Sequence, residues 1–207
     1  MRIRCIMFDM GRVLVDFSHD RMFAAMGEVC GASGQQIREW LWDSGLQGRF
    51  ERGEIDAEAV RDELQGRVGR EIDETALMRA GSDIFTLNEP LLRVIDRLKR
   101  AGLRLIVVSN TCPPHVEWIG RKWDLLERFD ALVFSYEVGA MKPGPEIYRA
   151  AIEVSGCEPA ECFFVDDLPE NVEAARALGL AGTVFIGVES LQVALARAGV
   201  SAACESD

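Results

Sequence analysis

The sequence predicts an α/β fold in which a parallel sheet is flanked by helices and carries an inserted helical cap. Short apolar runs alternate with helical patterns along most of the chain, which is typical of parallel strands joined by helical crossovers. Residues 18–87 differ, because they show helical periodicity and contain no convincing strand. These two observations together indicate one sheet-based core and one helical insertion.

The predicted elements of the core follow from local patterns of apolar residues. Short apolar runs predict strands over residues 3–8, 103–108, 131–134, 162–165 and 183–186. Apolar residues at three- and four-residue spacing predict helices over residues 90–101, 143–155, 170–178 and 191–198. Glycines stand where these helices are expected to end, at Gly102, Gly156, Gly179 and Gly199.

The insertion contains four helical patterns, over residues 22–29, 37–46, 57–68 and 75–85. It leaves the core after the first strand and returns before the second, so we expect it to cover the carboxyl ends of the strands. We therefore predict a core of residues 1–17 and 88–207 and a helical cap of residues 18–87. Trp40, Trp42 and Met26 lie at helical spacing in the cap, which favours packing over contact with a ligand.

Composition argues against several classes of protein. The chain has 207 residues, of which 48% are hydrophobic and 28% charged, and no apolar stretch approaches the length of a membrane span. A net charge of -11 disfavours binding to nucleic acid or to a membrane surface. The apolar segment at the N-terminus stops at Asp9, which is too early for a secretory signal, so we expect a cytoplasmic protein. The six cysteines show no C-x-x-C spacing, which indicates reduced thiols.

Polar and charged side chains follow four of the predicted strands. In an open parallel sheet, ligands bind outside the carboxyl ends of the strands, near the point where the strand order reverses. Asp9 alone could be a simple helix cap, but acids, hydrogen-bond donors and a cation at the other strand ends favour a shared site. The candidate site residues are therefore Asp9, Ser109, Asn110, Thr111, Lys142, Asp166 and Asp167.

Four segments surround these strand ends: Phe8-Asp9-Met10-Gly11, Val108-Ser109-Asn110-Thr111, Met141-Lys142-Pro143 and Phe164-Val165-Asp166-Asp167. In their order and spacing they resemble the four motifs of the haloacid dehalogenase-like hydrolase superfamily. Residues 50–55, 110–115 and 142–148 are also similar to bacterial sugar-phosphate phosphatases related to the epoxide hydrolase N-terminal domain. The resemblance implies a Rossmann-like core, a helical cap and Mg2+-dependent hydrolysis of a phosphomonoester through an aspartyl-phosphate.

The resemblance implies that Asp9 is the nucleophile and that Mg2+ is the cofactor. Asp9, the backbone carbonyl of Gly11 and Asp166 would bind the ion, which prefers hard oxygen ligands and keeps several waters. Asp167 would orient metal-bound waters or Lys142. The substrate would be a small phosphorylated metabolite, such as a sugar phosphate, and the protein a monomer or homodimer.

Hydrogen-bond donors and a cation complete the predicted catalytic set. Ser109 and Asn110 can donate to the non-bridging phosphoryl oxygens, where charge is held in the transition state. Lys142 adds a positive charge at the same place. We thus predict Asp9, Ser109 and Lys142 as catalytic residues, and a substrate-binding set of Ser109, Asn110, Thr111 and Lys142.

Gly11 departs from the common pattern of the superfamily. Most of its phosphatases have a second aspartate at this position, which protonates the leaving alcohol, and such assistance is worth about 10²–10⁴-fold in rate. The carbonyl that binds metal is present in glycine, whereas the acid is absent. We therefore expect rates to depend strongly on the pKa of the leaving group.

Three hypotheses account for Gly11. The first is a phosphatase whose proton donor is Asp16, His19, His115, Asp167, a metal-bound water or the substrate, and the Asp166-Asp167 pair favours it. The second is a metal-independent 2-haloacid dehalogenase, which expels halide and needs no proton donor. The third is a phosphate-binding or regulatory protein with little turnover.

Overall fold

The structure is a computed structural model that describes residues 2–201. Its centre is a five-stranded parallel sheet in the order β5-β4-β1-β6-β7. The strands are β1 (Cys5–Phe8), β4 (Arg104–Ser109), β5 (Ala131–Phe134), β6 (Cys162–Asp166) and β7 (Ala181–Val184). Strands β4 and β5 lie on one side of β1, and β6 and β7 lie on the other, so the strand order reverses at β1. This arrangement confirms the predicted α/β fold.

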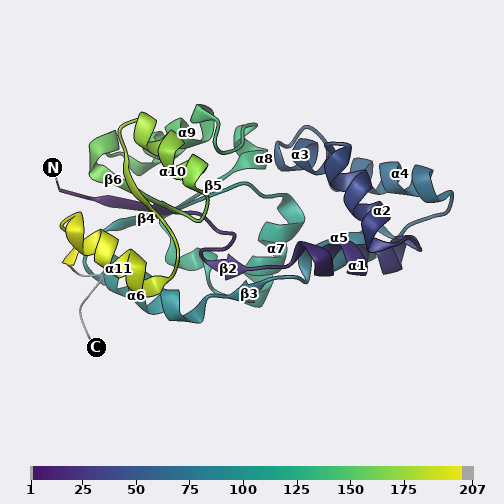
Figure 1. Cartoon of the computed structure of the whole chain (residues 1–207), viewed down its shortest axis with the longest axis horizontal. Coiled ribbons are helices and arrows are strands. Elements are labelled where there is room, and N and C mark those ends of the chain that lie inside the picture. Colours follow the sequence, from purple (N-terminus) through teal and green to yellow (C-terminus); the bar gives the residue numbers. More distant parts are fainter. Residues whose placement is uncertain (1, 202–207) are drawn as a thin grey trace.

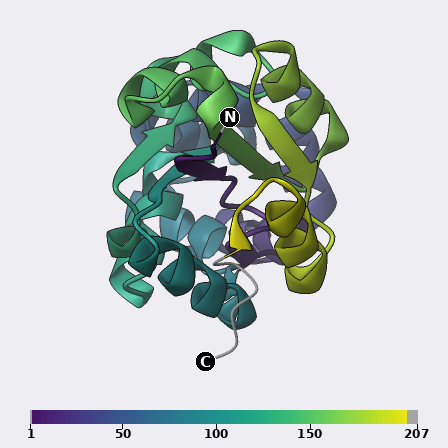
Figure 2. The same ribbon diagram turned by 90° about the vertical axis from the view of Figure 1, so that its left-hand side faces the viewer.

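Helices cover both faces of the sheet (Figure 2). One face packs against α9 (Pro145–Ser155) and α10 (Pro169–Ala177), and the other against α6 (Glu89–Arg100) and α11 (Val188–Arg197). Alternate residues of β1 serve the two faces: Cys5 and Met7 join one apolar cluster, and Ile6 and Phe8 join the other. All four residues of β1 are buried, because helices cover both faces of the sheet. This burial on both sides explains why the strand is apolar throughout.

The insertion is a group of helices at one end of the molecule (Figure 1). Its elements are α1 (His19–Cys30), α2 (Gly34–Arg38), the π-helix η1 (Glu39–Asp43), α3 (Leu46–Glu51), α4 (Ala57–Val68) and α5 (Glu74–Ser82). The short strands β2 (Val15–Asp16) and β3 (Thr86–Leu87) pair antiparallel where the chain leaves and re-enters the core. This ribbon lies close to the predicted cap boundaries, and its hydrogen bonds join the two segments that connect the cap to the core.

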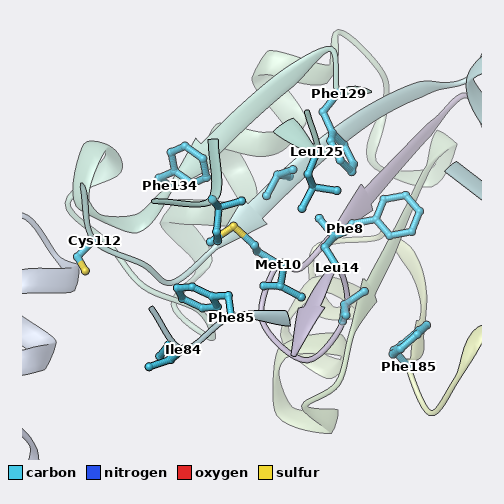
Figure 3. Packing of buried hydrophobic residues seen from close by; sticks show 14 of the residues in the cluster. Phe8, Met10, Leu14, Ile84, Phe85, Cys112, Leu125, Phe129, Phe134 and Phe185 are labelled. Atoms are coloured by element: carbon cyan, nitrogen blue, oxygen red, sulfur yellow. The ribbon is translucent and has the colours of Figure 1, made fainter. Parts of the chain in front are cut away.

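One apolar cluster continues from the sheet into the cap. It contains Phe8 and Leu14 of the core together with residues of α1, α4 and α5. Figure 3 shows Met10, the residue after Asp9, turned into this cluster with Phe85 and Phe134. The cap is thus packed against the core by buried side chains. Among residues 2–201, no helix is long and apolar enough to cross a membrane.

Some local predictions were wrong in detail. The helix predicted over residues 37–46 is divided, because α2 ends at Arg38, a π-helix follows and Gly45 adopts a left-handed conformation before α3. The last predicted strand lies two residues earlier, at β7. The sequence pattern did not predict α7 (Pro113–Lys122), in which only Ile119 is fully buried, so its apolar periodicity is weak. The short helix α8 (Ser135–Val138) was also not predicted.

Candidate active site

Asp9, Lys142 and Asp166 meet at the carboxyl end of the sheet. Asp9 follows β1, Asp166 ends the neighbouring strand β6, and Lys142 comes from the loop after α8. The Lys142 Nζ lies 2.7 Å from Asp9 Oδ1 and 2.7 Å from Asp166 Oδ2. All three residues are buried, so the ammonium and the two carboxylates interact with little screening by water. The structure therefore brings together the predicted nucleophile, cation and metal-binding acid.

Asn110 holds the lysine in place. Its side-chain Nδ2 donates to the Lys142 carbonyl oxygen at 2.9 Å, and the Lys142 backbone N–H donates to Asn110 Oδ1 at 2.8 Å. The sequence suggested only a phosphate-binding role for Asn110. Because an amide nitrogen carries two hydrogens, one N–H remains for a phosphoryl oxygen. Asn110 thus positions Lys142, and its contact with the substrate remains a prediction.

The other predicted donors, Ser109 at the end of β4 and Thr111 in the following loop, are buried. Within residues 2–201, the one hydrogen bond of Ser109 Oγ is a long contact of 3.4 Å with the Asn110 carbonyl oxygen. The Thr111 hydroxyl is buried and lacks a hydrogen-bond partner among residues 2–201. Ser135 braces the loop, because its Oγ accepts the Thr111 N–H at 2.9 Å and donates to the Thr111 carbonyl oxygen at 3.1 Å. Ser135 was not among the predicted site residues.

Three carboxylates form a group suited to a hard cation. Single oxygens of Asp9, Asp166 and Asp167 lie within 4.8 Å of one another. Asp166 Oδ1 also accepts the Leu168 N–H at 2.9 Å and Asn171 Nδ2 at 3.0 Å, which fixes the orientation of the carboxylate. All these potential ligands are oxygens, the class that Mg2+ prefers. The donor set therefore fits the predicted ion. Asn171 supports Asp166 and was not predicted from the sequence.

Burial and the charges of neighbouring groups shift the pKa values of Asp9, Lys142 and Asp167. Burial raises the pKa of Asp9 to about 7, although the nearby Lys142 ammonium opposes this shift. Burial disfavours the charged form of Lys142, but Asp9 and Asp166 outweigh that effect and raise its pKa. Burial and the neighbouring Asp166 raise the pKa of Asp167. Three carboxyl groups around one ammonium therefore disfavour one another's ionised forms, and a divalent cation would stabilise those forms.

Gly11 faces an aromatic ring. The backbone of Gly11 is not left-handed, so any residue could adopt it. A Cβ at this position would lie 2.9 Å from Phe17 Cε1, well inside van der Waals contact. Arg12 lies over the same ring, with its guanidinium carbon 4.7 Å from the centroid, and also pairs with Asp16. Where most superfamily phosphatases carry their acid, this chain has the Phe17 ring.

The other proposed proton donors occupy different surroundings. Asp16 is exposed, pairs with Arg12 and accepts the Phe17 N–H at 2.9 Å. His19 packs against Phe17, at 4.7 Å between ring centroids, and burial lowers its pKa. His115 Nε2 lies 3.2 Å from the Gly81 carbonyl oxygen and joins α7 to the cap. The structure therefore gives Asp16, His19 and His115 packing or pairing contacts, and only Asp167 lies among the carboxylates.

The structure also contains a large cleft. It has a volume of about 1220 Å³ and opens between the cap and α7. Its walls include Phe50, Ile55, Met78, Pro114, Trp118 and Tyr136. Asp9, Lys142 and Asp166 do not line it, so the buried carboxylates and the cleft are separate features of the cap–core boundary.

His115 should make the protein sensitive to acid. Burial, together with the nearby His19, lowers the pKa of His115 to about 4, although its contact with Gly81 opposes the shift. In the unfolded chain a histidine has a pKa of about 6.5, so the unfolded state takes up the proton first as the pH falls. The wild-type protein should therefore lose up to about 3 kcal/mol of unfolding free energy between about pH 6.5 and pH 4 from this group. Denaturant unfolding of wild type and His115→Gln at several pH values tests this, and equal pH slopes would exclude the effect.

Comparison with known families follows the same segments of the chain. Residues 3–179 match the family model described as haloacid dehalogenase-like hydrolase. The chain belongs to the haloacid dehalogenase-like hydrolases. This membership confirms the resemblance inferred from the four motifs. It identifies the chain as an enzyme of a hydrolase family that includes phosphatases.

Individual relatives of this hydrolase include phosphatases. D-ribitol-5-phosphate phosphatase of Bacteroides thetaiotaomicron is 30% identical over 185 residues, which span 86% of this chain and 89% of that protein. A family enzyme of the same organism, solved with magnesium and inorganic phosphate, superposes with a TM-score of 0.79 and 25% identity over 88% of this chain and 93% of that chain. Rat bifunctional epoxide hydrolase 2 is 30% identical over 105 residues, 46% of this chain but only 18% of that longer protein.

Proposed function

We propose that this hydrolase removes the phosphoryl group from a small phosphomonoester, such as a sugar phosphate, with Mg2+ as cofactor and Asp9 as nucleophile. The observation that carries the proposal is the meeting of Lys142 with two buried carboxylates, Asp9 and Asp166, beside the third acid Asp167. The magnesium and phosphate bound in the related Bacteroides structure support the choice of ion and substrate group.

Mg2+ would be held by Asp9, the Gly11 carbonyl and Asp166, and would supply positive charge against the phosphoryl oxygens. The chain itself supplies the rest of the electrostatic support. Lys142 lies between Asp9 and Asp166, and Ser109 is buried at the end of the neighbouring strand β4. Fixed positive charge and hydrogen-bond donors at this place would stabilise the charge of the phosphoryl group in the transition state.

Asp9 is oriented for attack by its own hydrogen bonds. Its Oδ1 accepts the Met10 N–H at 2.6 Å and faces Lys142, which leaves Oδ2 without a hydrogen-bond donor among residues 2–201. We infer that Oδ2 forms the bond to phosphorus while the bond to the ester oxygen breaks. Water then attacks phosphorus, the bond to Asp9 breaks, and inorganic phosphate and the free carboxylate result.

The leaving oxygen departs with the electron pair of the broken bond. Because residue 11 has no acid, we infer that this oxygen takes its proton from water rather than from a side chain at that position. Good leaving groups then react faster than simple alkyl groups. This dependence sets the proposed enzyme apart from relatives with a second aspartate.

A substrate panel with and without Mg2+ tests the proposed function. We expect Mg2+-dependent release of phosphate from aryl and sugar phosphates, and loss of that release in excess chelator with recovery when Mg2+ is added back. No halide should be released from a 2-haloacid under either condition. Turnover that survives the chelator would contradict the metal requirement, and metal-independent halide release would establish the dehalogenase alternative. Binding of phosphate without turnover would favour the regulatory alternative.

A further inference from the structure

The ring of Phe17 lies against Gly11. Phe17 Cε1 lies 2.9 Å from the place of a Cβ on residue 11, and Cδ1 and Cζ lie at 3.7 Å. The ring therefore fills the direction in which a side chain at position 11 would extend. In most superfamily phosphatases that side chain reaches the leaving group, as the resemblance implies. The Phe17 ring thus stands next to the place where the leaving group would lie.

The ring is held from several sides. The Arg12 guanidinium lies over it at 4.7 Å, and Arg12 is itself paired with Asp16. Phe85 packs edge-on at 6.1 Å between ring centroids. A side chain confined in this way loses little conformational entropy when it contacts a ligand, which suits a recognition surface.

Further rings continue this surface into the cap. His19 lies 4.7 Å from Phe17, and Trp42 lies 4.4 Å from His19, between ring centroids. Trp42 belongs to the π-helix η1, and 40% of its surface is exposed although it is a large apolar residue. Irregular helical turns of this kind are frequent at functional sites. The row of Phe17, His19 and Trp42 therefore leads from Gly11 into the cap.

We propose that Phe17 contacts the leaving group and selects phosphomonoesters whose leaving group carries a ring close to the ester oxygen. Flat aromatic faces pair favourably with other rings, and such a pair gains more than its buried area alone provides. This inference rests on the proposed phosphatase activity, since it names the substrate class of that same site. It also gives a reason for Gly11, because a residue without a side chain leaves room for the Phe17 ring where a proton donor would otherwise lie.

Benzyl phosphate and hexyl phosphate test this selection. Both release primary alcohols of similar acidity, so their comparison reports recognition of the ring with little influence of leaving-group pKa. We expect Phe17→Leu to lower the ratio of kcat/KM for benzyl over hexyl phosphate by about three- to tenfold, mainly through KM for the benzyl ester. Phe17→Tyr should keep the ratio, because it retains the ring.

Two further variants separate selection from folding. Phe85→Leu removes a ring that packs against Phe17 and only supports it, so it should lower the ratio much less than Phe17→Leu does, even if the melting temperature falls. Gly11→Ala should lower the ratio while Phe17 is retained, because its Cβ must displace the ring. An unchanged ratio in Phe17→Leu, whether or not both esters lose the same amount of kcat/KM, would overturn the inference. If wild type hydrolyses neither ester nor any other phosphomonoester, the proposed function itself fails.

Discussion

Asp9→Asn should reduce Mg2+-dependent phosphate release by about 10³-fold or more, while the protein remains folded. An amide oxygen is a poor nucleophile toward phosphorus, and an amide binds Mg2+ more weakly than a carboxylate. The fold should survive because Lys142 keeps its contact with Asp166 at 2.7 Å. Steady-state turnover of an aryl phosphate and the melting temperature of the metal-free protein measure the two effects.

Asp16→Asn is the matched control for this substitution. Asp16 undergoes the same chemical change near the same loop, but its carboxylate is exposed and pairs with Arg12. Its turnover should stay within about twofold of wild type, because exposed ion pairs contribute little. Full activity in Asp9→Asn would contradict the nucleophilic role. Equal losses in both variants would point to damage of the loop instead.

Lys142→Met should reduce turnover by about 10²–10³-fold and also destabilise the metal-free protein. The substitution leaves Asp9 and Asp166 buried side by side without the ammonium that contacts both. Removing one partner of a buried ion pair typically costs about 3–5 kcal/mol. Added Mg2+ should restore part of the unfolding free energy, because it would again place positive charge between the carboxylates, but should not restore turnover. Denaturant unfolding with and without Mg2+ measures this.

Lys122→Met serves as the control on the surface. Lys122 is exposed and lies 3.6 Å from the exposed Asp83, so its removal should change the unfolding free energy by less than about 1 kcal/mol. If Lys142→Met were as stable and active as this control, the buried contacts of Lys142 would have no role in folding or catalysis. That result would remove the main support for the proposed site.

The strand ends of the site could be predicted because buried parallel strands are short apolar runs that stop at polar residues. Asp9 and Asp166 lie far apart in the sequence, yet β1 pairs with β6 in a register that aligns Phe8 with Val165. This register sets the two carboxylates next to each other at one edge. Periodicity alone could not identify which strands are neighbours in the sheet. The order of the four motifs, through the family resemblance, indicated which strand ends lie together.

Contacts made only in three dimensions could not be predicted. Asn110 and the Lys142 backbone are separated by 32 residues, and nothing in the local pattern shows that they exchange two hydrogen bonds. The Phe17 ring against Gly11 is equally hidden, because the turn between them decides where the ring points. Pro113 and Pro114, at the first positions of α7, were the available signal for the helix that was missed.

Capture of the phosphorylated enzyme is the most direct test of the central claim that Asp9 attacks phosphorus. Wild-type protein with Mg2+ and an aryl phosphate would be quenched in acid during turnover, digested, and the peptide that contains Asp9 weighed by mass spectrometry. We predict one added phosphoryl group on Asp9, which hydroxylamine removes and which Asp9→Asn lacks. An unmodified Asp9 peptide in samples that are turning over, with the phosphoryl group on another residue, would contradict the claim.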